Sequence, residues 1–184
     1  MINKIFIAIF LVLYITDVNA ADYSYVKNRI AMLNEADEQN RITIVQELGR
    51  LSSNANLIIP DLIFILKNED SHKVKMEVIR ALERIGGQAN KTVPALIEAL
   101  SDENWEIRWS AAGALISFGK KSAVAVPELI TLLRDPEEYV QNAALATLGK
   151  MGPISVAAMM DEVMKPLDYA DDQLKIRLVC IKSL

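Results

Sequence analysis

The chain has 184 residues, an apolar fraction of 52% and a net charge of −4, from 24 acidic and 20 basic side chains. This length suffices for one domain with a sizeable core, and the composition excludes a disordered polar chain. The mild acidity disfavours nucleic acid as a partner, because binding to phosphates needs a basic face.

The first twenty residues have the pattern of a secretory signal peptide. Lys4 precedes an unbroken apolar run over 5–15, and Val18 and Ala20 stand at the −3 and −1 positions of a cut after Ala20. The apolar run is too short for a bilayer core, which takes about 20 residues. We expect cleavage and export to the periplasm or the exterior, with no membrane attachment afterwards. A retained N-terminal anchor or a buried helix is the alternative.

Residues 21–36 are predicted to form an N-terminal capping segment with a helix at 24–34, and residues 37–184 to form the main domain. The single cysteine, Cys180, has no partner for an internal disulfide. Its apolar neighbours indicate an inert buried thiol. The absence of a disulfide framework favours the bacterial periplasm and requires the fold to be held by its core.

Three similar segments recur at a spacing of 33 residues. KVKMEVIRALERIG, EIRWSAAGALISFG and YVQNAALATLGKMG end at Gly86, Gly119 and Gly152. When the three segments are aligned, apolar residues occupy the same alignment columns, and these columns are four residues apart. Four residues is the spacing of one face of a helix. The closing glycine suits a helix C-terminus, where a left-handed residue is favoured.

A second helix is predicted after each glycine. Pro60, Pro94 and Pro127 occur in the related stretches IPDLIFIL, VPALIEAL and VPELITLL. Proline is well tolerated near a helix start, because its missing N–H has no helical partner there. The unit is therefore helix, turn, helix, turn.

The units comprise a divergent one at about 37–68, three regular ones, and the first half of another at 171–184. A single hairpin of this size cannot bury its apolar face, whereas stacked hairpins bury a continuous core. We therefore expect an all-α protein, a right-handed α-solenoid of about four to five helical hairpins.

The stretch DENWEIRWSAAGALISFGKKSAVAVPELITLL resembles HEAT repeats, and is closest to the short class first noticed in phycobilisome lyases. The resemblance covers about 37–184. Ser52 and Ser53 stand where the first unit should have a glycine, and Gln141 replaces the usual arginine. The resemblance implies a solenoid whose first helices line a concave surface. It says little about function, because such repeats serve many roles.

Two charged columns accompany the repeat. Their members are Lys75, Arg108, Gln141 and Arg177 in the basic column, and Glu69, Asp102, Asp135 and Asp171 in the acidic one. The resemblance implies that these columns tie adjacent repeats together. A ladder for an acidic ligand is the alternative, which the break at Gln141 disfavours. Asp135 is also expected to cap the following helix, with Pro136 at its first position.

Both tryptophans lie on the first helix of one unit, four residues apart and on one face. Their columns contain these residues in the neighbouring units: His72 and Glu138 for Trp105, Met76 and Asn142 for Trp109. Polar residues in these columns indicate partial exposure, because burying an unpaired polar group costs about 1–3 kcal/mol. Gly113 leaves space beside the rings.

Exposed tryptophans dominate the binding energy of many protein interfaces. The candidate partner-binding residues are therefore Trp105, Trp109, Arg108, Met76, His72, Glu138 and Asn142. The alternative is that the two indole rings pack on each other and on Met76 as part of the core.

Sequence patterns for catalysis are missing. One histidine cannot build a histidine-rich metal site, no nucleophile elbow surrounds a serine, and no glycine-rich phosphate loop occurs. We predict a non-enzymatic scaffold without a cofactor, which binds another protein on its concave face. The apolar C-terminal stretch QLKIRLVCIKSL indicates either that the array of repeats is cut short or that this edge is covered by another chain or, through self-association, by a second copy.

Two other functions follow from the resemblance. A chaperone that attaches or carries a tetrapyrrole chromophore, as phycobilisome lyases do, is the main alternative, and the signal peptide disfavours it. A HEAT-like protein that binds DNA conflicts with the acidic charge and with export.

Overall fold

The computed structural model describes residues 24–33, 35–51 and 54–164. The predicted signal peptide, Cys180, the half unit at 171–184 and the apolar C-terminal edge lie outside the described residues.

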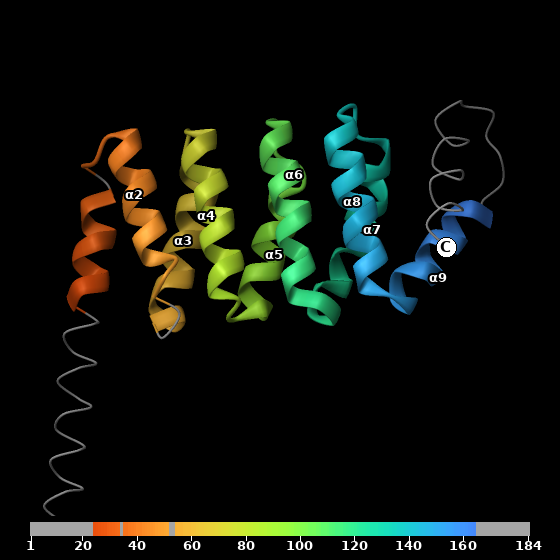
Figure 1. Ribbon diagram of the computed structural model, residues 1–184, viewed down its shortest axis with the longest axis horizontal. Helices are drawn as coiled ribbons and strands as arrows, with labels where there is room; N and C mark the ends of the chain where they lie inside the picture. Colours follow the sequence, from red (N-terminus) through yellow and green to blue (C-terminus); the bar gives the residue numbers. More distant parts are fainter. Residues whose placement is uncertain (1–23, 34, 52–53, 165–184) are drawn as a thin grey trace, which may run out of the picture.

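Helical hairpins stack side by side along the long axis of the molecule (Figure 1). A helix at 24–33 precedes the hairpins. The further elements are α2 Glu38–Leu48, α3 Ala55–Asn68, α4 His72–Ile85, α5 Ala89–Ala99, α6 Trp105–Ala114, the 3-10 segment η2 Leu115–Ala125, α7 Val126–Thr131, η3 Leu132–Arg134, α8 Glu138–Met151 and α9 Pro153–Met164.

Successive hairpins are arranged in two rows of helices. The first helices α2, α4, α6 and α8 contact one another in order and form one row, which we call the first-helix row. Helices α3 and α5 with η2 and α7 form the second row behind it. The predicted all-α solenoid of helical hairpins is confirmed.

A continuous core fills the space between the two rows. The predicted apolar columns are fully buried, and they comprise Val74, Ile107, Val140, Leu82, Leu115 and Leu148. Each side chain contacts the core cluster that runs through all the described hairpins. Stacking therefore buries the apolar face that one hairpin would expose.

The predicted glycines close the first helices of three hairpins. Gly86, Gly119 and Gly152 have positive φ angles of 64°, 51° and 71°, a region that costs glycine little. In two of these turns a buried hydroxyl stabilises the chain reversal. Ser122 Oγ lies 2.9 Å from the Leu115 carbonyl oxygen and 2.6 Å from that of Gly119. Ser155 makes the equivalent pair of contacts one unit later.

The second helices begin earlier than the prolines predicted. Pro60 and Pro94 lie inside α3 and α5, whereas only Pro127 lies in the first turn of its helix, α7. Each interior proline lacks the N–H that would bond to the carbonyl one turn earlier. The second helix begins directly after the turn that follows each first helix. Pro60 and Pro94 therefore lie further inside their helices than expected, and their predicted position near the helix start was wrong.

Ion pairs connect each hairpin to the next at the N-terminal end of the first-helix row. We call them the inter-repeat ladder, which comprises Arg41 with Glu69, Lys75 with Asp102, and Arg108 with Asp135. Arg108 and Asp135 form a bidentate pair, with Nε–Oδ2 and Nη2–Oδ1 distances of 2.7 and 2.8 Å. Gln141, where the basic column breaks, donates to the Asp135 carbonyl oxygen instead. The structural interpretation of both columns is confirmed within the described residues.

Asp135 serves this ladder and does not cap α8 as predicted. Helix α8 begins at Glu138 with Glu137 before it, while the Asp135 carboxylate accepts from Arg108 and from the backbone N–H of Glu137. Burial alone would raise the pKa of Asp135, but these bonds and the Arg108 charge outweigh it, so the pKa is lowered. The same pairing raises the pKa of Arg108.

We expect Arg108→Ala to lower the free energy of unfolding by about 2 to 3 kcal/mol, because Asp135 would stay buried without its partner. The Arg108 side chain retains 13% exposure and Asp135 only 4%, so we place the loss near the lower end for buried pairs. Urea denaturation at neutral pH measures it. Lys67→Ala, which breaks the exposed Lys67–Glu98 pair, is the control and should cost less than about 0.5 kcal/mol.

The loss should also depend on pH. Because the folded pKa of Asp135 is lowered, its stabilising contribution is present above the unfolded value of about 3.9 and is lost as the pH falls below it. The difference between wild type and Arg108→Ala should therefore shrink below about pH 4. A difference that stays constant down to acid pH would contradict a charged pair.

Ser122→Ala should destabilise the chain by about 1 to 2 kcal/mol, because it removes a buried donor from two carbonyl oxygens. Ser117→Ala is the matched control. Ser117 lies nearby but is exposed, and its hydroxyl donates to Glu83. Thermal unfolding of both variants makes the comparison, and equal midpoints would show that the turn does not need the buried hydroxyl.

Candidate partner-binding face

The two tryptophans occupy different environments although they lie on one helix. Trp105, the first residue of α6, is half-buried and packs against the core cluster. Trp109, one turn further, keeps 43% of its surface exposed. Trp105 thus anchors the edge of the core, whereas Trp109 presents an indole ring to the outside.

Trp105 stacks on an aromatic ring of the next hairpin. Its ring centroid lies 5.7 Å from that of Tyr139 on α8, with 26° between the ring planes. Tyr139 itself is 66% exposed. The expected alternative, in which the two indole rings pack on each other, therefore misses the actual partner of Trp105. The signal in the sequence was the aromatic side chain of Tyr139 itself, which lies one residue from the position that aligns with Trp105 in the next unit.

Other contacts between first turns run along the same row. Ser71 and Lys73 bond to Glu38, and these two hydrogen bonds, with Ser71 the stronger cause, lower the pKa of Glu38. His72 Nε2 lies 3.9 Å from Glu106 Oε2. The aromatic stack between α6 and α8 therefore occupies the position where earlier hairpins have polar pairs.

The remaining predicted residues surround the rings. Met76 on α4 is half-buried, and Glu138 and Asn142 on α8 are exposed. Arg108 is held by Asp135 in the inter-repeat ladder, so its guanidinium is committed to the fold. His72 lies exposed at the start of α4. We call Trp105, Trp109, Tyr139, Met76 and Asn142 the aromatic face.

Open space lies at Gly113, one turn beyond Trp109 on α6. A side chain added at Gly113 would meet no atom within 4 Å, so the predicted open space is present. Ile116, one turn further, is 36% exposed on the same side of the helix. Glu106 and Glu138 lie in the first turns of α6 and α8, next in sequence to Trp105 and Tyr139. Acidic side chains therefore accompany the aromatic rings at the N-terminal ends of these two helices.

Neither a cluster of metal-ligating side chains nor a membrane-spanning helix occurs in the part of the chain that the structure describes. No cluster of three histidine, cysteine, aspartate or glutamate residues there is arranged to hold a metal ion. None of the helices there has the length and hydropathy that crossing a bilayer would take.

The family model for HEAT repeats matches this chain over residues 59–148 and 93–170. The chain belongs to the HEAT-repeat family. The matched segments cover the regular hairpins whose columns build the core and the ladder, so the resemblance of the sequence is confirmed. No sequence among the curated proteins matches the chain.

Solved structures share the fold of this HEAT-repeat chain. One is the complex of CpcE and CpcF of phycocyanin lyase from Nostoc sp. PCC7120, with a TM-score of 0.61 and 21% identity over 86% of this chain. The chain spans 63% of that structure's chain. An engineered protein matches with a TM-score of 0.56 and 20% identity, over 86% of this chain and 77% of its own. At these identities the likeness shows the fold.

The two tryptophans should respond differently to removal. Trp105→Ala should lower the free energy of unfolding by about 2 kcal/mol, since it removes a ring that packs on the core and on Tyr139. Trp109→Ala should cost less than about 1 kcal/mol because its ring is largely exposed. Urea denaturation of the two single variants tests this, and a larger loss for Trp109→Ala would place that ring in the core.

Proposed function

We propose that this chain is an exported, non-enzymatic scaffold that binds a segment of another protein on the aromatic face. The observation that carries the proposal is the exposure of Trp109 and Tyr139 on adjacent helices, with open space at Gly113, one turn beyond Trp109. Large exposed aromatic rings are common anchors of protein interfaces.

The charge around the face indicates the chemistry of the partner. Glu106 and Glu138 lie in the first turns of α6 and α8, and the exposed Glu137 precedes α8. A partner segment with an apolar anchor and basic side chains on one side of it would complement this arrangement. The apolar anchor would supply affinity, while the charges would favour association and fix the orientation.

Membership in the HEAT-repeat family supports this function, because stacked hairpins present extended surfaces that bind other proteins. The solved lyase structure is itself a complex of two proteins, CpcE and CpcF. That likeness adds support for a protein partner, although the partner's identity does not transfer at 21% identity.

Trp109→Ala should abolish capture of the partner without unfolding the chain. Residues 21–184, the form that the predicted cleavage releases, would be used to isolate partners from the envelope and secreted fractions of the source organism. The affinity of an identified partner should fall about 30-fold, the loss expected for a central aromatic anchor.

Phe64→Ala is the matched control for that experiment. Phe64 is 66% exposed on α3, in the second row of helices, so its loss removes an exposed aromatic ring from the other side. Equal binding by the wild type and both variants would show that the aromatic face is not the binding surface. A loss confined to Phe64→Ala would move the site to the second row.

Transport or attachment of a tetrapyrrole is a second candidate, favoured only by the likeness to the phycocyanin lyase complex. Titration of the purified chain with an open-chain tetrapyrrole tests it. A saturable change in the pigment's absorbance that Trp109→Ala removes would favour this function over the scaffold.

A further inference from the structure

Five basic side chains are set apart from all the others in the described residues. Arg50, Lys91, Lys120, Lys121 and Lys150 are exposed and have no ion-pair partner there. Every other lysine and arginine of that part has an ion pair or another polar, ring or electrostatic contact. The five lie at the turns that join first helices to second helices, and we call them the basic edge.

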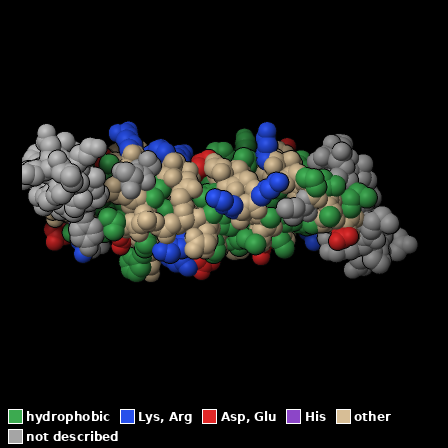
Figure 2. Space-filling model, turned by 90° about the horizontal axis from the view of Figure 1, so that it is seen from below, with side chains coloured by type: hydrophobic (Ala, Val, Ile, Leu, Met, Phe, Trp, Pro, Cys, Tyr) green, Lys and Arg blue, Asp and Glu red, His purple; other side chains and the backbone are tan. Residues whose placement is uncertain are grey.

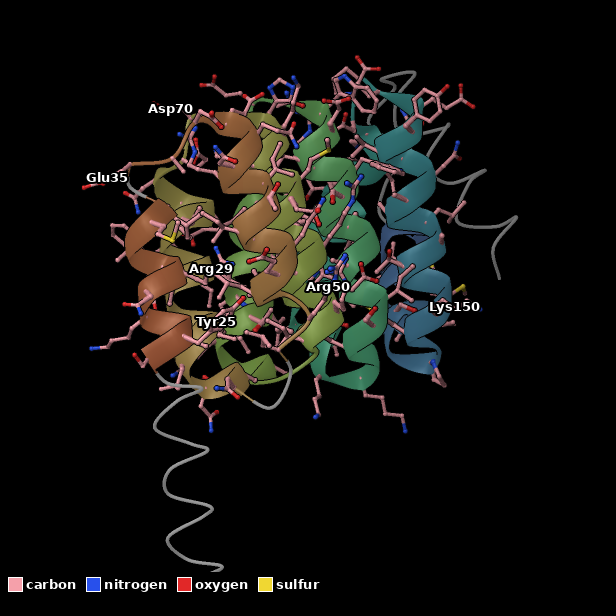
Figure 3. All side chains as sticks on the ribbon, turned by 60° about the vertical axis from the view of Figure 1, so that its left-hand side comes forward. Tyr25, Arg29, Glu35, Arg50, Asp70 and Lys150 are labelled. Carbon is pink, nitrogen blue, oxygen red and sulfur yellow. The ribbon has the colours of Figure 1, made fainter. Side chains whose placement is uncertain are left out.

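The turns at the two edges of the solenoid differ in charge. The turns of the basic edge, over 49–54, 86–91, 119–125 and 150–155, contain no acidic residue. The opposite turns contain Glu35, Asp37, Glu38, Glu69, Asp70, Asp102, Glu103, Asp135 and Glu137. Figure 3 shows Glu35 and Asp70 toward one end of the helices and Lys150 toward the other, and the basic edge faces the viewer in Figure 2.

The fold does not account for most of the basic edge. Lys150 lies in the last turn of α8, where the helix dipole favours a cation. Lys91, however, lies in the first turn of α5, where the dipole disfavours a positive charge. Lys120 and Lys121 lie next to each other between Gly119 and the start of α7, and neither makes an ion pair within the described residues. Repulsion between these two like charges does not stabilise the fold. Their position therefore indicates a role other than stability.

Exposed aliphatic groups accompany these cations. A hollow of about 730 Å³ between α5 and η2 is lined by Gln88, Ala89, Asn90, Val93, Pro94, Lys121 and Val124. Val124 is 66% exposed. Cations next to exposed aliphatic side chains are typical of surfaces that bind the interfacial region of anionic membranes, where both groups contribute.

The chain enters the solenoid at the basic edge. The helix at 24–33 contacts the last turn of α2 through Tyr25 and Arg29, which both reach Glu47, so it begins beside the end of α2. Figure 3 shows Tyr25 at this lower end. Only residues 16–23 separate the helix from the apolar run at 5–15, and they span at most about 29 Å. In the alternative of a retained anchor, the membrane that holds the apolar run would therefore lie close to the basic edge, and after the predicted cleavage the edge would have to bind by itself.

We propose that the basic edge binds the surface of a membrane rich in anionic phospholipids. The cations occur in the turns of four successive hairpins, so they form a charged strip rather than a pocket for one small anion. A strip of this kind matches a plane of phosphate groups. The first helices would then extend away from the membrane surface, and the aromatic face would stay accessible. The binding of lipid does not depend on the proposed protein partner.

Vesicle binding by residues 21–184 tests the proposal, because that form lacks the apolar run. The chain should sediment with vesicles of equimolar phosphatidylglycerol and phosphatidylcholine, and should not sediment with phosphatidylcholine alone. Raising the salt from about 50 to about 500 mM should release it, since exposed charges are then screened. Lys120→Gln/Lys121→Gln should bind about 10- to 30-fold more weakly, from about 1 kcal/mol per cation.

Lys67→Gln/Lys73→Gln is the matched control. It makes the same change of net charge at the acidic edge, where both lysines are exposed in surface ion pairs. This variant should bind vesicles like the wild type, and circular dichroism should show equal helicity for all three proteins. Equal weakening by both double variants would overturn the proposal, because net charge alone would then explain binding.

Two further results would also overturn it. Equal binding to neutral and anionic vesicles would exclude an electrostatic edge. Failure to bind either vesicle, with salt-sensitive binding of poly-glutamate that depends on Lys120 and Lys121, would assign the basic edge to an acidic protein instead. Loss of partner capture with intact vesicle binding would affect only the proposed function, so the two failures are distinguishable.

Discussion

Each helical hairpin of this chain depends on its neighbours, because two short helices cannot bury their own apolar face. The recurring core residues, such as Leu82, Leu115 and Leu148, are buried only when the hairpins stack. Apolar contact is not directional, so stacking alone would leave the offset between hairpins weakly defined. The inter-repeat ladder supplies that direction. Its bidentate Arg108–Asp135 pair accepts only a narrow range of geometries.

Because the core and the inter-repeat ladder hold the hairpins together, the surface residues can differ between repeats. Residues of the core recur at the same positions in each unit and those of the ladder recur up to Gln141, whereas the residues in the first turns of the first helices differ between units. At these first turns Lys73 and Glu38 pair between α2 and α4, while Trp105 and Tyr139 stack between α6 and α8. The fold therefore tolerates an aromatic pair in place of a polar one, and that substitution creates the candidate binding face.

Function is distributed over different sides of the solenoid. The aromatic face belongs to the first-helix row, and the basic edge belongs to the turns at one end of the helices (Figure 2). Because a turn residue and a mid-helix residue of the same unit project in different directions, one repeat can contribute to both surfaces. A chain with a net charge of −4 can thus present a basic strip, since the turns that carry these cations contain no acidic residue, whereas the opposite turns contain several. Net charge by itself gives a poor guide to the partners of such a molecule.

The sequence by itself determined the repeat, the helical hairpins and the core columns, because the spacing of apolar residues and turn glycines is a local property of each unit. It also indicated the ladder through paired columns of charge. Only the tertiary structure decided which aromatic rings meet, where α3 and α5 begin, and that Asp135 binds Arg108 instead of capping α8. Those outcomes depend on contacts between residues about 30 positions apart, which periodicity places in neighbouring helices but does not bring to a defined distance. The difference in charge between the two edges also depends on the tertiary structure. It arises because the turns from first to second helices lie at one edge of the solenoid and the turns between hairpins lie at the other.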